Sequence, residues 1–101
     1  MAVTTSSTDD GKALTIAISG NFDFNVVQDF RKAYVGIDSA EVDVTIDMRE
    51  AEYMDSSALG MLLNMKKHLG GDSADVRIIN CRPQIKKILD ISRFDKKFKI
   101  D

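Results

Sequence analysis

The sequence has no long hydrophobic run, and this absence argues against a membrane-spanning helix. Such a helix needs about 18 to 20 consecutive apolar residues, whereas every apolar run in this chain of 101 residues is short. Residues 1–8 also lack the basic start and the apolar centre of a signal peptide. We therefore expect a cytoplasmic protein that does not insert directly into a membrane.

Cysteine and histidine are scarce, with only Cys81 and His68 present. A single cysteine cannot form an internal disulfide, as is usual in a reducing compartment. The sequence also lacks a phosphate-binding glycine loop, a dinucleotide-binding glycine pattern and a paired-histidine metal motif. Asp47 and Asp55 flank a strand–helix unit, but the sequence offers them no evident third ligand. We expect neither a metal nor a cofactor.

An excess of positive charge is missing as well. The 14 basic and 16 acidic residues give a net charge of −2 and a pI near 5.3. Because binding to a phosphate backbone depends on clustered cations, this balance argues against nucleic acid as a partner. Lys96, Lys97 and Lys99 form a small basic group near the C-terminus, which we interpret as a solvated tail.

Hydrophobic periodicity predicts a single α/β domain over residues 1–101. Apolar residues at alternate positions, or in short runs, predict strands at 3–8, 14–19, 42–48 and 75–81, with a final short strand near residue 100. Helical spacing predicts helices at 25–37, 53–69 and 83–91, with Pro83 in the first turn of the last one. Gly20 would end the second strand, Asn25 with Gln28 would cap the first helix, and Gly36, Asp38 and Ser39 would end it.

The order of these elements predicts an α/β sandwich with a mixed sheet of four to five strands. The turn at residues 9–11 makes the N-terminal hairpin antiparallel, and the strand–helix–strand crossovers make the later pairs parallel. Residues 42–48 alternate between apolar and polar side chains. Such a strand is apolar on one side only, so we expect the helices mainly on one face of the sheet.

The helix predicted at 53–69 places serines at its start. Asp55 or Ser56 can cap the unpaired amide groups of the first turn. These groups and the helix dipole favour a negative charge by roughly 0.3 to 1 kcal/mol. Ser56 is thus a suitable position for a phosphate, although Ser56 and Ser57 are equally compatible with simple capping.

The segment Met54-Asp55-Ser56-Ser57-Ala58-Leu59-Gly60, preceded by the strand at 42–48, resembles the signature of the STAS family and of its bacterial anti-sigma factor antagonists. The order of elements is similar over about the whole chain. In that family a partner kinase phosphorylates the first serine after the aspartate, which is Ser56 here. Many members have Gly at the position of Ala58, and the resemblance implies that this methyl group affects how closely a partner approaches.

A second segment, Gly20-Asn21-Phe22-Asp23, is similar to the Gly-x-x-Asp loop that touches the kinase in these antagonists. The resemblance implies that Phe22 is buried and that Asp23 and Phe24 face the partner. Met61 is expected to fill the core or an adaptable surface. The predicted partner-binding residues are Asp23, Phe24, Asp55, Ser56, Ser57, Ala58 and Met61.

The function that this resemblance implies is a phosphorylation switch rather than catalysis. Unphosphorylated protein would bind an anti-sigma factor or switch-type serine kinase, phosphorylation of Ser56 would end binding, and a serine phosphatase would reset it. A catalytic Ser56 would need a base, and His68 lies twelve residues along the same helix, about 18 Å away. Two alternatives stay open: an accessory subunit of a lipid-transporting ATPase complex, and a small-ligand or nucleotide sensor.

The C-terminal segment departs from the family pattern, because members commonly continue into a further helix after the last strand. We therefore expect apolar surface around Phe94 and Phe98, available to a partner or to a second copy. The oligomeric state stays open.

Overall fold

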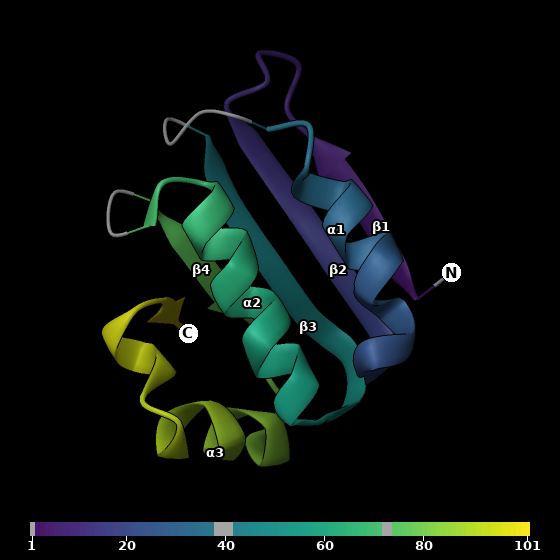
Figure 1. Ribbon diagram of the computed structural model, residues 1–101, viewed down its shortest axis with the longest axis vertical. Coiled ribbons are helices and arrows are strands. Elements are labelled where there is room, and N and C mark those ends of the chain that lie inside the picture. The colour runs from purple at the N-terminus through teal and green to yellow at the C-terminus, as the bar shows by residue number, and fades with distance from the viewer. Residues whose placement is uncertain (1, 38–41, 72–73) are drawn as a thin grey trace.

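One mixed sheet organises the chain, and its strands lie side by side in sequence order (Figure 1). The computed structural model describes residues 2–37, 42–71 and 74–101. In this part of the chain the strands are β1 (Val3–Ser7), β2 (Ala13–Phe22), β3 (Asp43–Met54), β4 (Val76–Ile79) and β5 (Lys99–Ile100). Strands β1 and β2 are antiparallel, and the other neighbouring pairs are parallel. The predicted mixed sheet with an antiparallel N-terminal hairpin is confirmed.

The helices connect these strands and cover mainly one face of the sheet, as expected (Figure 1). The α-helices are α1 (Val27–Tyr34), α2 (Ser56–His68) and α3 (Pro83–Ile91), and the described residues also include the short 3₁₀ helices η1 (Phe24–Val26) and η3 (Phe94–Lys96). Helices α1 and α2 lie next to each other on the sheet, while α3 lies at the end where α2 begins. None of the helices in the described residues is long and apolar enough to cross a membrane.

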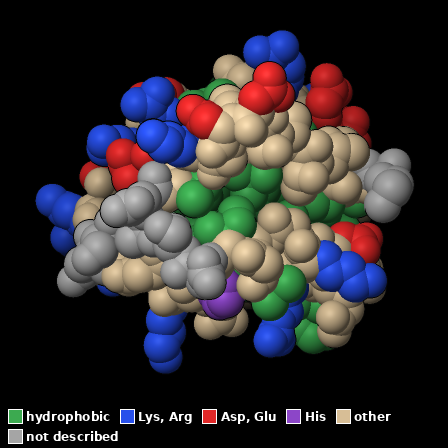
Figure 2. All heavy atoms as spheres, turned by 90° about the horizontal axis from the view of Figure 1, so that it is seen from above, with side chains coloured by type: hydrophobic (Ala, Val, Ile, Leu, Met, Phe, Trp, Pro, Cys, Tyr) green, Lys and Arg blue, Asp and Glu red, His purple; other side chains and the backbone are tan. Residues whose placement is uncertain are grey.

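The hydrophobic core lies between the sheet and helices α1 and α2. Ile16, Ile46 and Leu62 are completely buried there, and burial of such a side chain contributes about 1.5 to 3 kcal/mol. Thr15 and Thr45 alternate with the buried residues and are only partly covered. Figure 2 views the molecule from the end opposite α3, where hydrophobic side chains show in the middle and charged side chains lie around them.

Strand β3 is longer than the sequence indicated and continues to Met54, so Tyr53 and Met54 do not belong to the following helix. Its pairing with β2 contains two irregularities, each of which adds one residue to β3. The buried side chains in this half are consequently Met48, Ala51 and Met54, spaced by three. Bulges of this kind bend a strand and interrupt its alternation. Because of the two bulges, the apolar residues between 48 and 54 do not alternate as in a regular strand, and the sequence pattern did not indicate a strand there.

The region between β2 and α1 also differs from the prediction. Strand β2 does not end at Gly20 but passes through it to Phe22, and Gly20 adopts φ +73° beside one of the irregular pairs. Asn25 does not cap the helix. The chain enters α1 through η1, and the carboxylate of Asp23 accepts the hydrogen bond from the amide of Asn25 instead. Helix α1 ends at Tyr34, while Asp38 and Ser39 lie outside the described residues.

The expected exposure of Phe94 and Phe98 is wrong. Only 5% of Phe94 and 3% of Phe98 are exposed, because η3 folds this segment back onto the core. Their rings are stacked with centroids 5.3 Å apart, and the ammonium group of Lys66 lies 5.8 Å from the centre of the Phe98 ring. The C-terminal segment is therefore part of the core.

Candidate functional site

The candidate site is built where β2 and β3 end side by side. Phe22 and Met54, the last residues of the two strands, are register partners. Asp23 and Asp55 follow them directly, so the two strand ends bring these aspartates to the same edge of the sheet. The amide of Asp55 donates a hydrogen bond to the carbonyl of Phe22, over 3.3 Å, which ties the two connections together.

The first connection holds one aromatic side chain inside the protein and one outside. Asp23 accepts a hydrogen bond of 2.9 Å from the amide of Asn25 and so begins η1. Phe22 is completely buried, as the resemblance implied, whereas 67% of Phe24 is exposed. A large apolar side chain with this exposure is available for contact with another protein. The contact roles of Asp23 and Phe24 stay predictions.

The second connection begins α2, and Asp55 is its cap. One carboxylate oxygen of Asp55 accepts hydrogen bonds from the amides of Ser57, at 3.0 Å, and Ala58, at 3.2 Å. The same oxygen accepts a hydrogen bond of 2.6 Å from the hydroxyl of Ser57. The Ser57 hydroxyl, followed by the two amides, lowers the pKa of Asp55 below its ordinary value. Asp55 therefore carries a full negative charge at neutral pH.

Ser56 has a different environment from Ser57. It is the first residue of α2 and is exposed, and within the described residues its hydroxyl has no hydrogen-bond partner. The amides of Ser57 and Ala58 are already bonded to Asp55. The geometry thus presents one serine hydroxyl to solvent at the start of a helix, beside a fixed carboxylate.

Two of the predicted contact residues are buried. The side chain of Ala58 is completely buried and offers a partner no direct contact, while the expected effect of its methyl group on a partner's approach stays a prediction. It packs in the core beneath the first turn of α2. Met61 is only 6% exposed and also belongs to the core, although its side chain lines a surface groove between α1 and α2.

The structure adds Tyr53 to this edge, a residue that the sequence analysis assigned to the start of a helix. Tyr53 is the register partner of Asn21, one position before the ends of the two strands, and 53% of it is exposed. An exposed aromatic residue three positions before Ser56 was a usable signal for a contact residue. Because Tyr53 was assigned to a helix, the sequence analysis did not include it among the contact residues.

The surroundings of Ser56 do not include a general base of the histidine type. His68 is the last residue of α2, twelve positions and about 18 Å from Ser56 along the helix. One imidazole nitrogen of His68 lies 2.9 Å from the carbonyl oxygen of Ile37. Asp47 accepts hydrogen bonds from the amide of Arg49 and the side chain of Asn80. Within the described residues, no group of three or more histidine, cysteine or acidic side chains is placed to hold a metal ion.

Together, fold and site define a small α/β domain that presents a capped helix start at the carboxyl end of two parallel strands. The chain belongs to the STAS domain family. The matching family model is described as "Mlab, STAS domain" and covers residues 5–100. A STAS-domain containing protein of Pseudomonas aeruginosa (strain UCBPP-PA14) is 48% identical over 100 residues, which are 99% of each chain.

Solved structures with a similar fold include anti-sigma factor antagonists. SpoIIAA, a Bacillus cell fate determinant, in its phosphorylated form has a TM-score of 0.71 at 18% identity, covering 99% of this chain and 91% of that one. An anti-sigma factor antagonist from Mycobacterium paratuberculosis has a TM-score of 0.74 at 19% identity, covering 97% of this chain and 84% of that one. At these identities the comparison establishes the fold.

Proposed function

We propose that this protein is an anti-sigma factor antagonist whose binding is controlled by phosphorylation of Ser56. The observation that carries the proposal is the contrast between the two serines at the start of α2. The hydroxyl of Ser57 is bonded to Asp55, whereas that of Ser56 is exposed. Membership of the STAS family and the similar fold of SpoIIAA, solved in a phosphorylated and an unphosphorylated form, support the same reading.

The switch follows from the charge that phosphorylation adds. A phosphoserine carries about −1.5 to −2 charges at neutral pH. It would stand beside the charged carboxylate of Asp55, with Asp23 following the neighbouring strand. A partner surface shaped around a neutral hydroxyl would then have to desolvate a dianion next to another negative charge. Binding of the unmodified protein is therefore strong, and binding of the phosphorylated protein is weak.

The partners of this cycle are an anti-sigma factor or an equivalent switch-type serine kinase, and a serine phosphatase that removes the phosphate. The protein itself acts as a binding module in the cytoplasm and carries out no catalysis. The position of His68 supports this, because its imidazole lies at the far end of α2 beside Ile37. Exposed Phe24 and Tyr53 would flank the contact with the partner.

The test compares variants at position 56 in a pull-down from cell extract, with retained proteins identified by mass. Ser56→Ala keeps a neutral side chain and should retain the partner permanently, whereas Ser56→Asp should lose it. Ser57→Asp is less suitable as a control because it would disturb the cap, so Ser57→Ala is the matched variant. Equal retention by Ser56→Ala and Ser56→Asp would overturn the proposal.

A second candidate function is docking on a lipid-transporting ATPase complex as an accessory subunit. The matching family model, described as "Mlab, STAS domain", is not described as an anti-sigma factor antagonist, and this keeps the second candidate open. The same exposed helix start would then bind its partner without modification. Co-purification with membranes, together with no phosphate on Ser56 after incubation with ATP and cell extract, would favour this function.

A further inference from the structure

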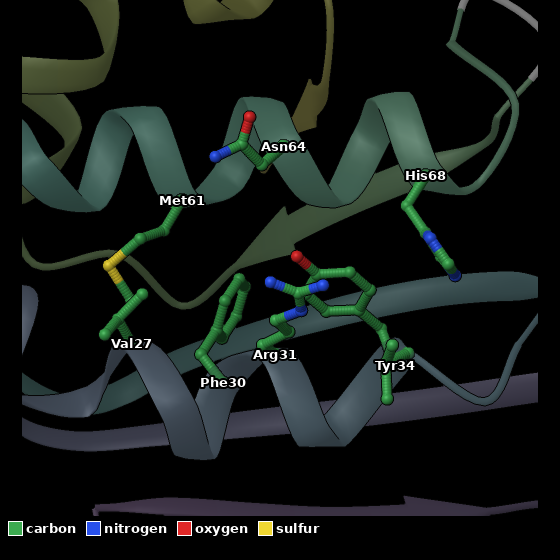
Figure 3. Close-up of a pocket in the computed structure, with 8 residues that line it drawn as sticks. Val27, Phe30, Arg31, Tyr34, Met61, Asn64 and His68 are labelled. Carbon is green, nitrogen blue, oxygen red and sulfur yellow. The ribbon is translucent and has the colours of Figure 1, made fainter.

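A groove of about 280 Å³ runs between α1 and α2 (Figure 3). Val27, Phe30 and Tyr34 line it from α1, and Met61 and His68 line it from α2. The site described above uses the start of α2 and the connection into α1, and of its predicted partner-binding residues only Met61 lines the groove.

The groove begins close to the Ser56 edge. Val27 is the first residue of α1 and directly follows η1, which carries the exposed Phe24. Met61 comes five residues after Ser56, which corresponds to about 7.5 Å along a helix. A protein that covers Phe24 and Ser56 therefore has the open end of the groove beside it.

Aromatic rings give the groove a fixed wall. The rings of Phe30 and Tyr34 lie with centroids 5.6 Å apart, and those of Tyr34 and His68 lie 5.4 Å apart. His68 is held at the far end by its contact with the carbonyl of Ile37. Recognition by such a preformed surface requires little ordering of side chains on binding.

The charged side chain that the described lining provides is a cation. Arg31 lines the groove and is exposed, and none of the described residues that line the groove is acidic. Figure 3 shows the side chain of Arg31 on the side of α1 that faces α2. Among the described residues Arg31 takes part in no salt bridge. The groove thus combines apolar walls with one cation that is available to a carboxylate.

We propose that the groove receives a segment of the partner protein that places an apolar side chain between α1 and α2 and a carboxylate against Arg31. This inference rests on the proposed function and extends its interface away from Ser56. The volume of the groove, about 280 Å³, is just below the roughly 300 to 1,000 Å³ of small-molecule pockets. Continuity with the Ser56 edge favours a protein segment over a free ligand.

The test uses a pair of charge reversals on neighbouring residues of α1. Arg31→Glu changes the groove, whereas Lys32→Glu makes the same change at an exposed residue that lies beside Val3 and Thr5 instead. The partner retained by Ser56→Ala is purified and titrated against both variants. We expect Arg31→Glu to weaken binding at least about tenfold, as for a close charge pair across an interface. Lys32→Glu should change it less than about twofold.

A second pair tests the apolar part of the groove. Val35 is 47% exposed and lines the groove, whereas Leu63 is 37% exposed and lies outside it. Val35→Ser should weaken binding several-fold, and Leu63→Ser should leave it unchanged. Thermal melting of each variant establishes that it is folded before it is titrated.

The outcomes separate this inference from the proposed function. Loss of binding in Arg31→Glu and Val35→Ser, with both controls unchanged, supports the groove contact. If Ser56→Asp abolishes binding but Arg31→Glu binds like the parent, the groove inference is overturned while the switch stands. A rise in melting temperature with benzoate or ATP that Arg31→Glu removes, without any effect on partner binding, would assign the groove to a small anion and also overturn it.

Discussion

Asp55 binds Ser57 twice, through its amide at 3.0 Å and through its hydroxyl at 2.6 Å, and both bonds go to the same carboxylate oxygen. A hydroxyl held in this way is partly buried and has its proton directed at Asp55. Ser56, one residue earlier, has neither constraint. The two serines of the motif therefore have separate roles, one in closing the helix start and one in facing outwards.

The first prediction is that Ser56 alone accepts phosphate. With ATP and cell extract, Ser56→Ala should abolish labelling, whereas Ser57→Ala should leave it largely intact, because its hydroxyl serves the cap. Mass spectrometry of the intact protein and of its peptides measures this. Phosphate on Ser57 in the Ser56→Ala variant, at the level of the parent, would contradict the separation of roles.

The second prediction concerns the pH dependence of stability at the cap. The pKa of Asp55 is lowered in the folded state, so its charged form stabilises the fold above the unfolded pKa of about 3.9. That contribution is lost as pH falls through the lower folded value. Asp55→Ala should cost about 0.5 to 2 kcal/mol at pH 7, as for loss of a helix cap. The gap in unfolding free energy between parent and variant should shrink below about pH 4.

Asp55→Asn is the matched control, because asparagine caps helices about as well as aspartate but does not titrate. The difference in unfolding free energy between Asp55→Asn and Asp55→Ala should stay constant between pH 7 and pH 3. Urea unfolding at each pH provides the free energies. A gap between the parent and Asp55→Ala that is the same at pH 3 and pH 7 would show that the charge of Asp55 contributes nothing.

The fold was largely predictable from the sequence because most apolar residues recur with the period of either a strand or a helix. Ile16, Ile18 and Ile46 alternate with polar neighbours along their strands, and Ile85 and Leu89 are spaced as on a helix. The predictions failed where irregular strand pairing changed the spacing of the apolar residues. In β3 two bulges change the spacing of the buried side chains from two to three, so Tyr53 and Met54 were assigned to the wrong element.

The site was predictable to a lesser degree. The helix start at Asp55 and Ser56 followed from the local sequence, since capping depends on neighbouring residues, and the burial of Phe22 was implied by the resemblance to the family. The burial of Ala58 and Phe94 was missed, because it depends on what another part of the chain places above them. The groove beside Arg31 was also not predictable, since it arises only when α1 and α2 are packed together on the sheet.

The third prediction tests the row of aromatic rings beneath α1. Phe30 is 1% exposed, and its ring lies 5.2 Å from that of Phe22 and 5.6 Å from that of Tyr34. Phe30→Ala should lower the free energy of unfolding by about 3 to 5 kcal/mol, through lost burial and the cavity left behind. Phe24→Ala removes the same side chain from an exposed position and should change stability by less than about 0.5 kcal/mol. Equal losses in urea unfolding would contradict the assignment of Phe24 to the surface.

The fourth prediction is a stabilising substitution. Gly60 lies within α2, and a Cβ atom added there would meet no heavy atom within 4 Å. Gly60→Ala should raise the free energy of unfolding by about 1 kcal/mol, the difference in helix propensity between the two residues. Thermal melting measures it. Gly36 also has open space around its Cβ position but lies outside the helices, so Gly36→Ala should lack the helical gain.

The fifth prediction uses the chain's cysteine as a probe of the fold. Cys81 follows β4 and is half-buried, and this burial raises the pKa of its thiol to about 11, against an ordinary value of 9.0. Because the thiolate is the reactive form, two pKa units correspond to about 100-fold slower alkylation of the folded protein near pH 8. Iodoacetamide labelling followed by mass spectrometry gives the rate, and the same measurement in urea supplies the unfolded reference. The pH profile of the folded protein should rise towards a midpoint near 11, and a midpoint near 9 would mean that the Cys81 thiol is not buried in solution.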